Sequence, residues 1–263
     1  MPVPKTPDFW PTLPIVVQYG GSPRFGLRYP EAEYNVVAAL KQSSRVSSIN
    51  LIITSSLRAK LSTISEQFSE LEELVLLSQE DVELTLPSTF RWGPRLRSLH
   101  STRIAFPSFP QLILASQDLV DLQLHEIPAF GYFSPEAFAN ALSGMTQLRS
   151  LSLHFHSSLN HEFSSPSGQR VVLPALTFLK YRGASKYLDN FVARIDGPRL
   201  GDIDITFLKF RRPTMDASQL GRFVDRIEIL RSHSRADVLI SEHAIFYSQE
   251  FLHRLDCKYR ASG

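Results

Sequence analysis

A short leucine motif recurs along most of the chain and constrains its fold more than any other feature. The motif has the form L-x-x-L-x-L, with some apolar substitutes, and begins at residues 46, 71, 96, 119, 148, 176 and 200, so that successive copies start 23 to 29 residues apart. This pattern at this spacing is typical of leucine-rich repeats, in which each copy supplies one strand. Because the segment after each strand carries the chain back to the start of the next, the strands are expected to run parallel. The sequence therefore predicts an α/β fold: a leucine-rich-repeat solenoid (horseshoe) with a parallel sheet on the concave face and helices on the convex face.

Several segments between the motifs have the apolar spacing of a helix. Leu57, Leu61, Ile64 and Phe68 lie at i, i+4, i+7 and i+11, which predicts a helix over about 57–68. Ser134 followed by Pro135 has the residue types of an N-cap and a first helical position, and predicts that another helix begins there. Further helices are predicted over 30–43, 111–116, 187–195 and 216–230, with a first strand at 15–19 and last strands at 237–241 and 244–247.

A repeat array has no natural internal boundary, because each unit contacts only its neighbours and shares one continuous core. The sequence therefore predicts a single domain over residues 1–263. It is expected to consist of an N-terminal cap (1–44), the repeats (45–241) and a C-terminal cap (242–263). A polar insertion over 157–169 lengthens one repeat.

Charge and cysteine content exclude several classes of partner. The chain has 28 basic and 26 acidic residues, a net charge of +2, which does not favour a nucleic acid or an anionic membrane surface. It has one cysteine, Cys257, so no internal disulfide can form, as expected for a reducing compartment. No apolar run approaches the ~20 residues of a membrane span, and the Pro-rich N-terminus has no signal-peptide core. We expect a soluble, monomeric, intracellular protein, cytoplasmic or nuclear.

The residues between the motif leucines point away from the core, because successive side chains of a strand alternate between faces. With no covering layer expected, they are free to bind a partner. The predicted partner-binding residues on the concave face are Glu73, Val75, Leu77, His100, Asp121, Gln123, His125, Ser152, His154, Phe178, Lys180, Arg182, Asp202 and Asp204. The alternative interpretation is a solvated face whose residues only suit a strand.

Three histidines on neighbouring predicted strands were considered as a metal site. His100, His125 and His154 could titrate near pH 6.5 and could in principle ligate a metal, but only Asp121 lies near enough to add a ligand. No metal is therefore predicted. The chain also lacks G-x-S-x-G, H-E-x-x-H and dinucleotide-binding motifs, so neither catalytic residues nor a cofactor are predicted.

Several stretches resemble known repeat proteins. LEELVLL (71–77), LVDLQL (119–124), LRSLSL (148–153) and LTFLKY (176–181) resemble leucine-rich repeats with helical backs. WPTLPIVVQYGG (10–21), FSPEAFANAL (133–142) and SQLGRFVDRIEIL (218–230) resemble the C-terminal part of F-box-like proteins of basidiomycete fungi. The resemblance implies that the repeats hold the substrate of a cullin ubiquitin ligase, to which an F-box helix bundle is joined through a Skp-type adaptor.

The chain departs from this family in two ways. It has no L-P-x-E helix followed by V-C-x-x-W, the hallmark of an F-box, so no residue is assigned to the adaptor, which is expected to bind only if an F-box lies upstream. Three explanations for the missing F-box stay open: the chain is a fragment, its gene sequence lacks the first exons, or the protein acts without the ligase. In addition, the positions that hold Asn or Cys in standard repeats are occupied by Thr54, Gln79, Ile104, Ile127, His156, Ala184 and Leu208.

These observations favour a non-catalytic protein–protein interaction module, with the concave face as the binding surface. Two alternatives stay open. The chain could be a truncated paralogue or structural repeat protein without a specific partner, or it could be an enzyme, which would need a deep pocket with clustered titratable groups.

Overall fold

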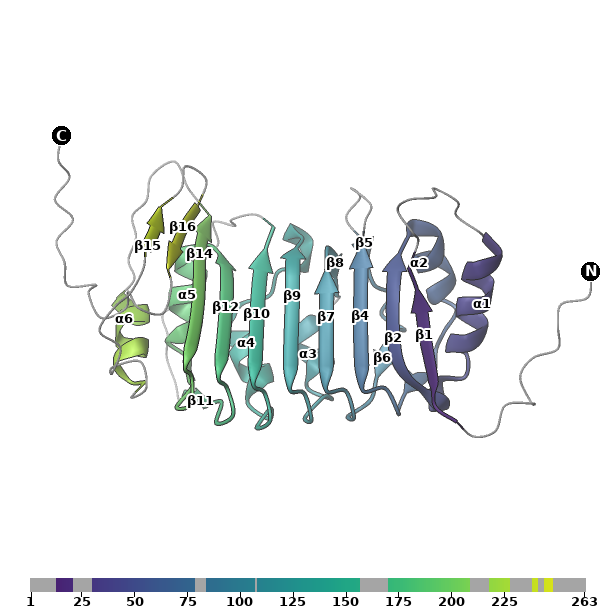
Figure 1. Ribbon diagram of the computed structural model, residues 1–263, viewed down its shortest axis with the longest axis horizontal. Helices are drawn as coiled ribbons and strands as arrows, with labels where there is room; N and C mark the ends of the chain where they lie inside the picture. Colours follow the sequence, from purple (N-terminus) through teal and green to yellow (C-terminus); the bar gives the residue numbers. More distant parts are fainter. Residues whose placement is uncertain are drawn as a thin grey trace, which may run out of the picture.

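Ten strands form one sheet across the described part of the molecule (Figure 1). The computed structural model describes residues 13–20, 30–78, 84–106, 108–156, 170–208, 218–227, 238–240 and 244–247, so the predicted insertion over 157–169 lies outside the described residues. Every neighbouring pair from β1 to β14 is parallel. In spatial order the strands are β1 Ile15–Tyr19, β2 Val46–Ile53, β4 Glu73–Ser78, β7 Ser98–Thr102, β9 Asp121–Ile127, β10 Ser150–Phe155, β12 Phe178–Gly183, β14 Asp202–Leu208, β16 Ala244–Tyr247 and β15 Val238–Ile240.

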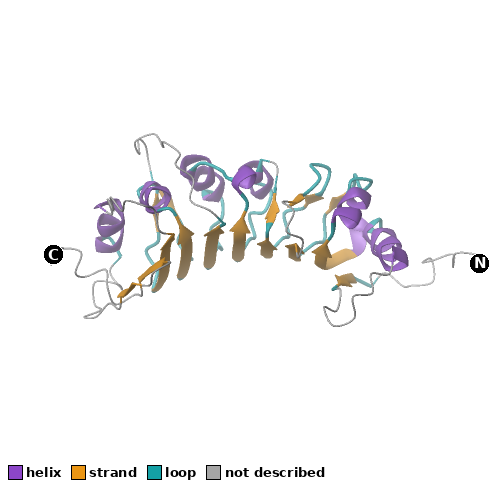
Figure 2. Ribbon diagram, turned by 90° about the horizontal axis from the view of Figure 1, so that it is seen from above, coloured by secondary structure: helices purple, strands orange, loops and turns teal. Residues whose placement is uncertain are grey.

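The described helices lie on one face of this sheet (Figure 2). They are α1 Pro30–Leu40, α2 Ser55–Leu61, α3 Phe109–Ile113, α4 Pro135–Leu142, α5 Ser185–Val192 and α6 Ser218–Asp225, with the 3₁₀ turns η1 Ser43–Arg45 and η2 Ala129–Gly131. Other parts of the return segments form two-stranded sheets: β3 Gln67–Phe68 with β6 Arg91–Trp92, β5 Leu84–Thr85 with β8 Ile104–Ala105, and β11 Val171–Val172 with β13 Ile195–Asp196. The large parallel sheet and its helices confirm the predicted α/β class.

The sheet is not curled into the predicted horseshoe (Figure 2). A repeat array curls when its back is wider than its front, as when helices ~10 Å across stand behind strands ~4.8 Å apart. Here several return segments pair as strands, so that neighbouring repeats lie nearly as close together at the back as at the front. We attribute the missing curl to these narrow backs.

Buried side chains from successive strands meet in register behind the sheet. The central row contains Ile49, Leu74, Leu99, Leu122, Leu151, Leu179 and Ile203, each at most 2% exposed. The first apolar residue of every motif is fully buried: Val46, Leu71, Leu96, Leu119, Leu148, Leu176 and Leu200. Burying one such side chain contributes about 1.5–3 kcal/mol, so these rows are the main source of stability.

A ladder of main-chain hydrogen bonds joins the starts of successive repeats. The Glu72 N–H donates to the Ser47 carbonyl at 2.9 Å, and the Arg97 N–H donates to the Glu72 carbonyl at 2.8 Å. The same N–H to carbonyl bond recurs in each later repeat: Val120 donates to Arg97, Arg149 to Val120, Thr177 to Arg149, and Gly201 to Thr177. The main chain thus connects the repeats directly, at the start of each strand.

Thr54, at one of the positions where standard repeats hold Asn or Cys, has a different local role. Its hydroxyl oxygen accepts the Leu57 N–H at 3.1 Å as the N-cap of α2, and its hydroxyl donates to the Glu33 carboxylate of α1 at 3.1 Å. Glu33 also accepts from the Ser56 hydroxyl at 2.7 Å and the Lys60 ammonium at 2.6 Å. Burial by itself raises the pKa of Glu33, but these hydrogen bonds outweigh it and hold the pKa below its ordinary value of 4.5. The ionised carboxylate therefore ties α1 to α2.

The predicted helix over 57–68 is wrong beyond Leu61, where α2 ends. The Ser62 hydroxyl donates to the Ala59 carbonyl at 2.6 Å, and the Thr63 hydroxyl donates to the Lys60 carbonyl at 2.8 Å, so side chains compete for groups of the last turn. Phe68 is still buried, but in strand β3. The predicted helix over 187–195 also runs too far, because α5 ends at Val192 and Ile195 pairs with Val171. By contrast, the predicted N-cap of α4 is confirmed, since the Ser134 hydroxyl accepts the Ala137 N–H at 3.1 Å.

The last two strands do not extend the parallel order. The predicted strands at 237–241 and 244–247 are present, but β16 pairs antiparallel with β14, and β15 pairs antiparallel with β16 at the sheet edge. Only residues 241–243 connect β15 to β16, and a connection this short can join only antiparallel neighbours.

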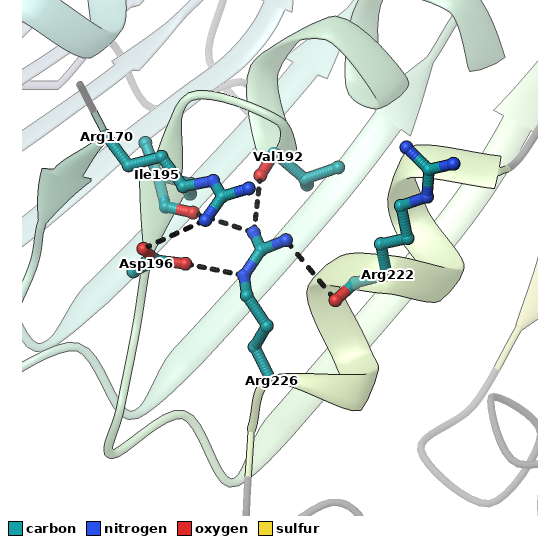
Figure 3. A network of polar contacts seen from close by, with 6 residues as sticks. All are labelled: Arg170, Val192, Ile195, Asp196, Arg222 and Arg226. Carbon is teal, nitrogen blue, oxygen red and sulfur yellow. Dashed lines mark hydrogen bonds and ion pairs between the residues drawn. The ribbon is translucent and has the colours of Figure 1, made fainter. Parts of the chain in front are cut away.

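The last described helix, α6, is held at both ends by side-chain hydrogen bonds. At its start, the Asp189 carboxylate accepts the Gln219 N–H at 2.9 Å and the Leu220 N–H at 3.0 Å. At its end, the Arg226 Nε donates to Asp196 at 2.7 Å, while Nη2 donates to the Val192 and Ile195 carbonyls at 3.3 Å (Figure 3). One guanidinium thereby links α6 to the carbonyls at the end of the preceding helix.

We expect Arg226→Ala to loosen α6, because several acceptors lose their donor at once. The expected cost is about 1–3 kcal/mol, with hydrogen–deuterium exchange of the α6 amides rising more than that of β9. Arg222→Ala is the matched control, since the Arg222 guanidinium points away from this network (Figure 3). Equal exchange in both variants would contradict the assigned role of Arg226.

The buried rows predict a sharp contrast between adjacent residues of β2. Leu51 is fully buried, so Leu51→Ala is expected to lower the free energy of unfolding by about 2–5 kcal/mol. Its neighbour Asn50 is exposed, so Asn50→Ala is expected to change it by less than about 0.5 kcal/mol. Urea unfolding monitored by circular dichroism measures both values.

Candidate partner-binding face

The face of the sheet opposite the helices carries all fourteen residues that the sequence predicted for partner binding. Glu73, Val75 and Leu77 stand on β4, and the other residues are distributed over β7, β9, β10, β12 and β14. We call the outward residues of β2 to β14 the open face. It also includes Ser48, Asn50, Ile52, Ser98, Thr102, Ser150 and Thr206. Because β4 and β14 are separated by four strands, the open face spans roughly 24 Å between them and forms an extended surface.

Three imidazoles stack at the centre of the open face. The rings of His125 and His154 are nearly parallel, with centroids 4.3 Å apart and an interplanar angle of 12°. His100 packs edge-on against His125, with centroids 5.1 Å apart. The structure thus brings together the three histidines from β7, β9 and β10, and we call them the histidine stack.

The hydroxyl of Ser152 lies between two of these imidazoles. Its oxygen is 3.1 Å from His125 Nε2 and 3.4 Å from His154 Nε2. A hydroxyl has one proton to donate, so if both contacts are hydrogen bonds at least one of the two nitrogens must carry a proton and act as donor. Ser152 is only 3% exposed, so it supports the histidine stack and does not itself present a group for contact, contrary to the sequence prediction.

The environment of the histidine stack keeps its members neutral. Desolvation by burial is the main cause that lowers the pKa of His154, to about 4, and the nearby imidazole of His125 and the cations Lys180 and Arg182 lower it further. Burial likewise lowers the pKa of His125 and of His100, although the Asp121 carboxylate acts in the opposite direction on both. At neutral pH the centre of the open face therefore carries neutral imidazoles, which can donate or accept hydrogen bonds.

The histidine stack is poorly arranged for a metal ion. The lone pairs of two stacked imidazoles lie in parallel ring planes and do not converge on one point, as a tetrahedral ion requires. In the part of the chain that the structure describes, no group of three or more His, Cys, Asp or Glu residues could hold a metal ion.

The rest of the open face is chemically mixed. On one side, Val75 and Leu77 form a half-buried apolar area beside the exposed Glu73. On the other, Lys180 forms an ion pair with Asp204 at 2.6 Å. The open face carries acidic residues on β4, β9 and β14 and basic residues on β12, so it does not have the uniform positive charge of a nucleic-acid surface.

Asp121 and Gln123 lie beside the histidine stack on the open face. The Gln123 amide donates to Asp121 Oδ2 at 2.8 Å. Asp121 Oδ1 and His100 Nε2 are buried and have no hydrogen-bond partner within the described residues. Phe178 is half-buried, whereas Arg182 and Asp202 are exposed.

Sequence analysis missed a bulge beside the histidine stack. The register between β9 and β10 shifts after Leu153, and Glu126 has a φ of 51°, in the left-handed region that non-glycine residues seldom occupy. The carboxylate of Glu126 pairs with the guanidinium of Arg103, whose own φ is 59°. The bulge places two residues of β9, His125 and Glu126, opposite one residue of β10, His154. A sequence gives little warning of it, since the bulge falls after the last leucine of the motif on both strands.

Comparison of the chain with protein-family models, curated proteins and solved structures gave no match. No helix in the described residues combines the length and apolar content needed to cross a membrane.

The neutral histidine stack predicts a loss of stability in mild acid. The unfolded chain binds a proton at His154 near pH 6.5, whereas the folded chain does so only near pH 4, so the unfolded state holds more protons between these values. The contribution of neutral His154 to the free energy of unfolding is therefore complete above pH 6.5 and is lost as the pH falls towards 4. Between pH 7 and pH 5 we expect a decrease of about 1–2 kcal/mol in the free energy of unfolding.

This decrease is measured by urea unfolding of the wild type and His154→Gln. Keeping the pH at 5 or above keeps Glu33 mostly ionised in both states, since its ordinary pKa is 4.5, and any remaining effect of Glu33 is shared by the wild type and the variant. The variant should show a smaller decrease. A decrease as large in the variant as in the wild type would mean that His154 does not titrate as its surroundings indicate.

Proposed function

We propose that the chain is a leucine-rich-repeat array that serves as a non-catalytic protein–protein interaction module, with the open face as its docking surface. The resemblance noted above extends this proposal: the array would correspond to the substrate-recognition repeats of an F-box-like component of a ubiquitin ligase. A Skp-type adaptor would join only through an F-box, for which no residue here is assigned.

The main support for this proposal is the difference in side-chain chemistry between the two faces of the sheet. The buried face repeats aliphatic residues at nearly every motif position, with Ser101 and Tyr181 as exceptions, whereas the open face changes its chemistry from strand to strand. Packing in the core explains the first pattern, but no contact with the described helices explains the second. A surface that varies along its length, with apolar, neutral polar and charged areas, suits recognition of another protein.

The mixed charge of the open face also favours a protein over other macromolecules. Glu73 on β4 and Arg182 on β12 are exposed and form no ion pair within the described residues. Glu73 accepts a hydrogen bond only from the Ser48 hydroxyl, at 3.0 Å, among the contacts of the described residues. A folded protein can offer one cation and one anion at that separation, whereas a nucleic acid offers only anions.

The test compares proteins captured by the wild type and by two doubly substituted variants of equal net charge. Glu73→Arg with Arg182→Glu reverses both exposed charges of the open face. Glu136→Lys with Lys186→Glu reverses two exposed charges on the helix side and is the matched control. We expect the open-face variant to capture at least about fivefold less of any specific partner, because like charges would meet across the interface, and the control to capture as much as the wild type.

Capture is quantified by mass spectrometry of chemically cross-linked complexes from an extract of cells that express the chain. Equal capture by all three proteins would exclude the open face as the docking surface. Absence of any partner from all three would favour the alternative, a structural repeat protein without a specific partner.

A further inference from the structure

An aromatic hollow lies away from the open face, where the central strands end. β8 follows the end of β7, and η2 follows the end of β9, so both turn towards the same edge of the sheet (Figure 1). The hollow has a volume of about 260 Å³. Its walls include Thr85 of β5, Ala105 of β8, Phe109 of α3 and Gly131 of η2. We call it the aromatic cavity.

Five of the ten residues that line it are aromatic, and four of these rings pack against other rings. Phe106 packs on Phe109 with centroids 5.4 Å apart, and Phe109 stacks on Phe133 at 5.4 Å. Trp92 closes the rear by an edge contact with Phe106 at 5.9 Å. A wall held in this way is preformed, so a ligand would not have to order it.

The outer wall is different. Phe130 is 48% exposed, and among the described residues no aromatic ring packs against it. A large apolar side chain that stands exposed at the mouth of a hollow is typical of a ligand site. The Phe130 ring is therefore available to cover a bound molecule.

Two backbone features shape the cavity at a cost to local stability. Ser108 has a φ of 53° at the start of α3, and its side chain makes no capping hydrogen bond, unlike Ser134 at α4. Residues held in this sparsely populated region cost stability and cluster at functional sites. Gly131 approaches β8 so closely that a Cβ there would lie 2.8 Å from Ala105 Cβ.

The chemistry of the lining restricts the ligand. None of the lining residues is Asp, Glu, Lys, Arg or His, so nothing in the wall would compensate a charged ligand. The hydroxyls of Thr85 and Ser108 offer hydrogen bonds at the rim. An apolar protein cavity of about 150 Å³ holds benzene, so the aromatic cavity is large enough for two fused rings.

We propose that the aromatic cavity binds a small uncharged molecule of two fused rings that carries one hydroxyl or carbonyl group. The rings would pack against Phe133 and beneath Phe130, which line the hollow and keep exposed surface, and the polar group would face Ser108. This site is independent of the open face, so failure of one proposal leaves the other standing.

The test is a calorimetric titration of the full chain with 2-naphthol, which is uncharged at pH 7. We expect one saturable site with a Kd on the order of 0.1 mM, as for a ligand of this size. Naphthalene-2-sulfonate has the same rings and a fixed negative charge, and it should bind at least about tenfold more weakly because the wall offers no cation. Absence of saturable binding by 2-naphthol, or equal binding of both probes, would overturn the proposal.

Two variants locate the site. Phe130→Ala removes the outer wall and should weaken binding of 2-naphthol at least about fivefold. Leu114→Ala, which removes another exposed apolar side chain that does not line the cavity, should bind as the wild type does. Both substitutions are at exposed positions, so far-ultraviolet circular dichroism should show an unchanged fold. Unchanged binding in Phe130→Ala would place any naphthol site elsewhere and overturn the assignment.

Discussion

The in-register stacking of buried aliphatic side chains from strand to strand is the interaction on which the rest of the structure depends. Each strand contributes one leucine or isoleucine to the central row, and each of these contacts its counterparts on both sides. Slipping one strand by a single residue would turn this apolar set outwards, so the row fixes the register as well as supplying stability. The open face follows from it, because every residue between two buried ones is forced to the other side of the sheet.

This row maintains a regular sheet even though the usual asparagine ladder is absent. Main-chain hydrogen bonds between repeat starts take part of that role, and individual repeats add their own links. In β12, for example, Tyr181 replaces the last leucine of the motif, and its hydroxyl donates to the Ala184 carbonyl at 2.7 Å. Gly183 makes room for it, since a Cβ at that position would lie 2.5 Å from the Tyr181 hydroxyl. Such local solutions differ between repeats, as do their backs.

Much of the fold could be predicted from the sequence because the information is local. The motif spacing located the strands, and Ser134 with Pro135 marked the start of α4. Errors occurred where a local pattern allowed two structures. The apolar spacing through Phe68 fits a helix, yet Ser62 and Thr63 end it, and Phe68 reaches the same core from a strand. Burial was therefore easier to predict than conformation.

The sequence by itself determined which residues are buried, which face outwards and that the repeats lie side by side, because a strand period of two and a repeat of about 25 residues are written within each unit. The absence of curl, the stacking of His125 on His154 and the aromatic cavity were decided only by the tertiary structure. The curl depends on the relative widths of the front and back of neighbouring repeats, and the histidine stack and the cavity each contain residues of more than one repeat. They arise between units, and no single repeat encodes them.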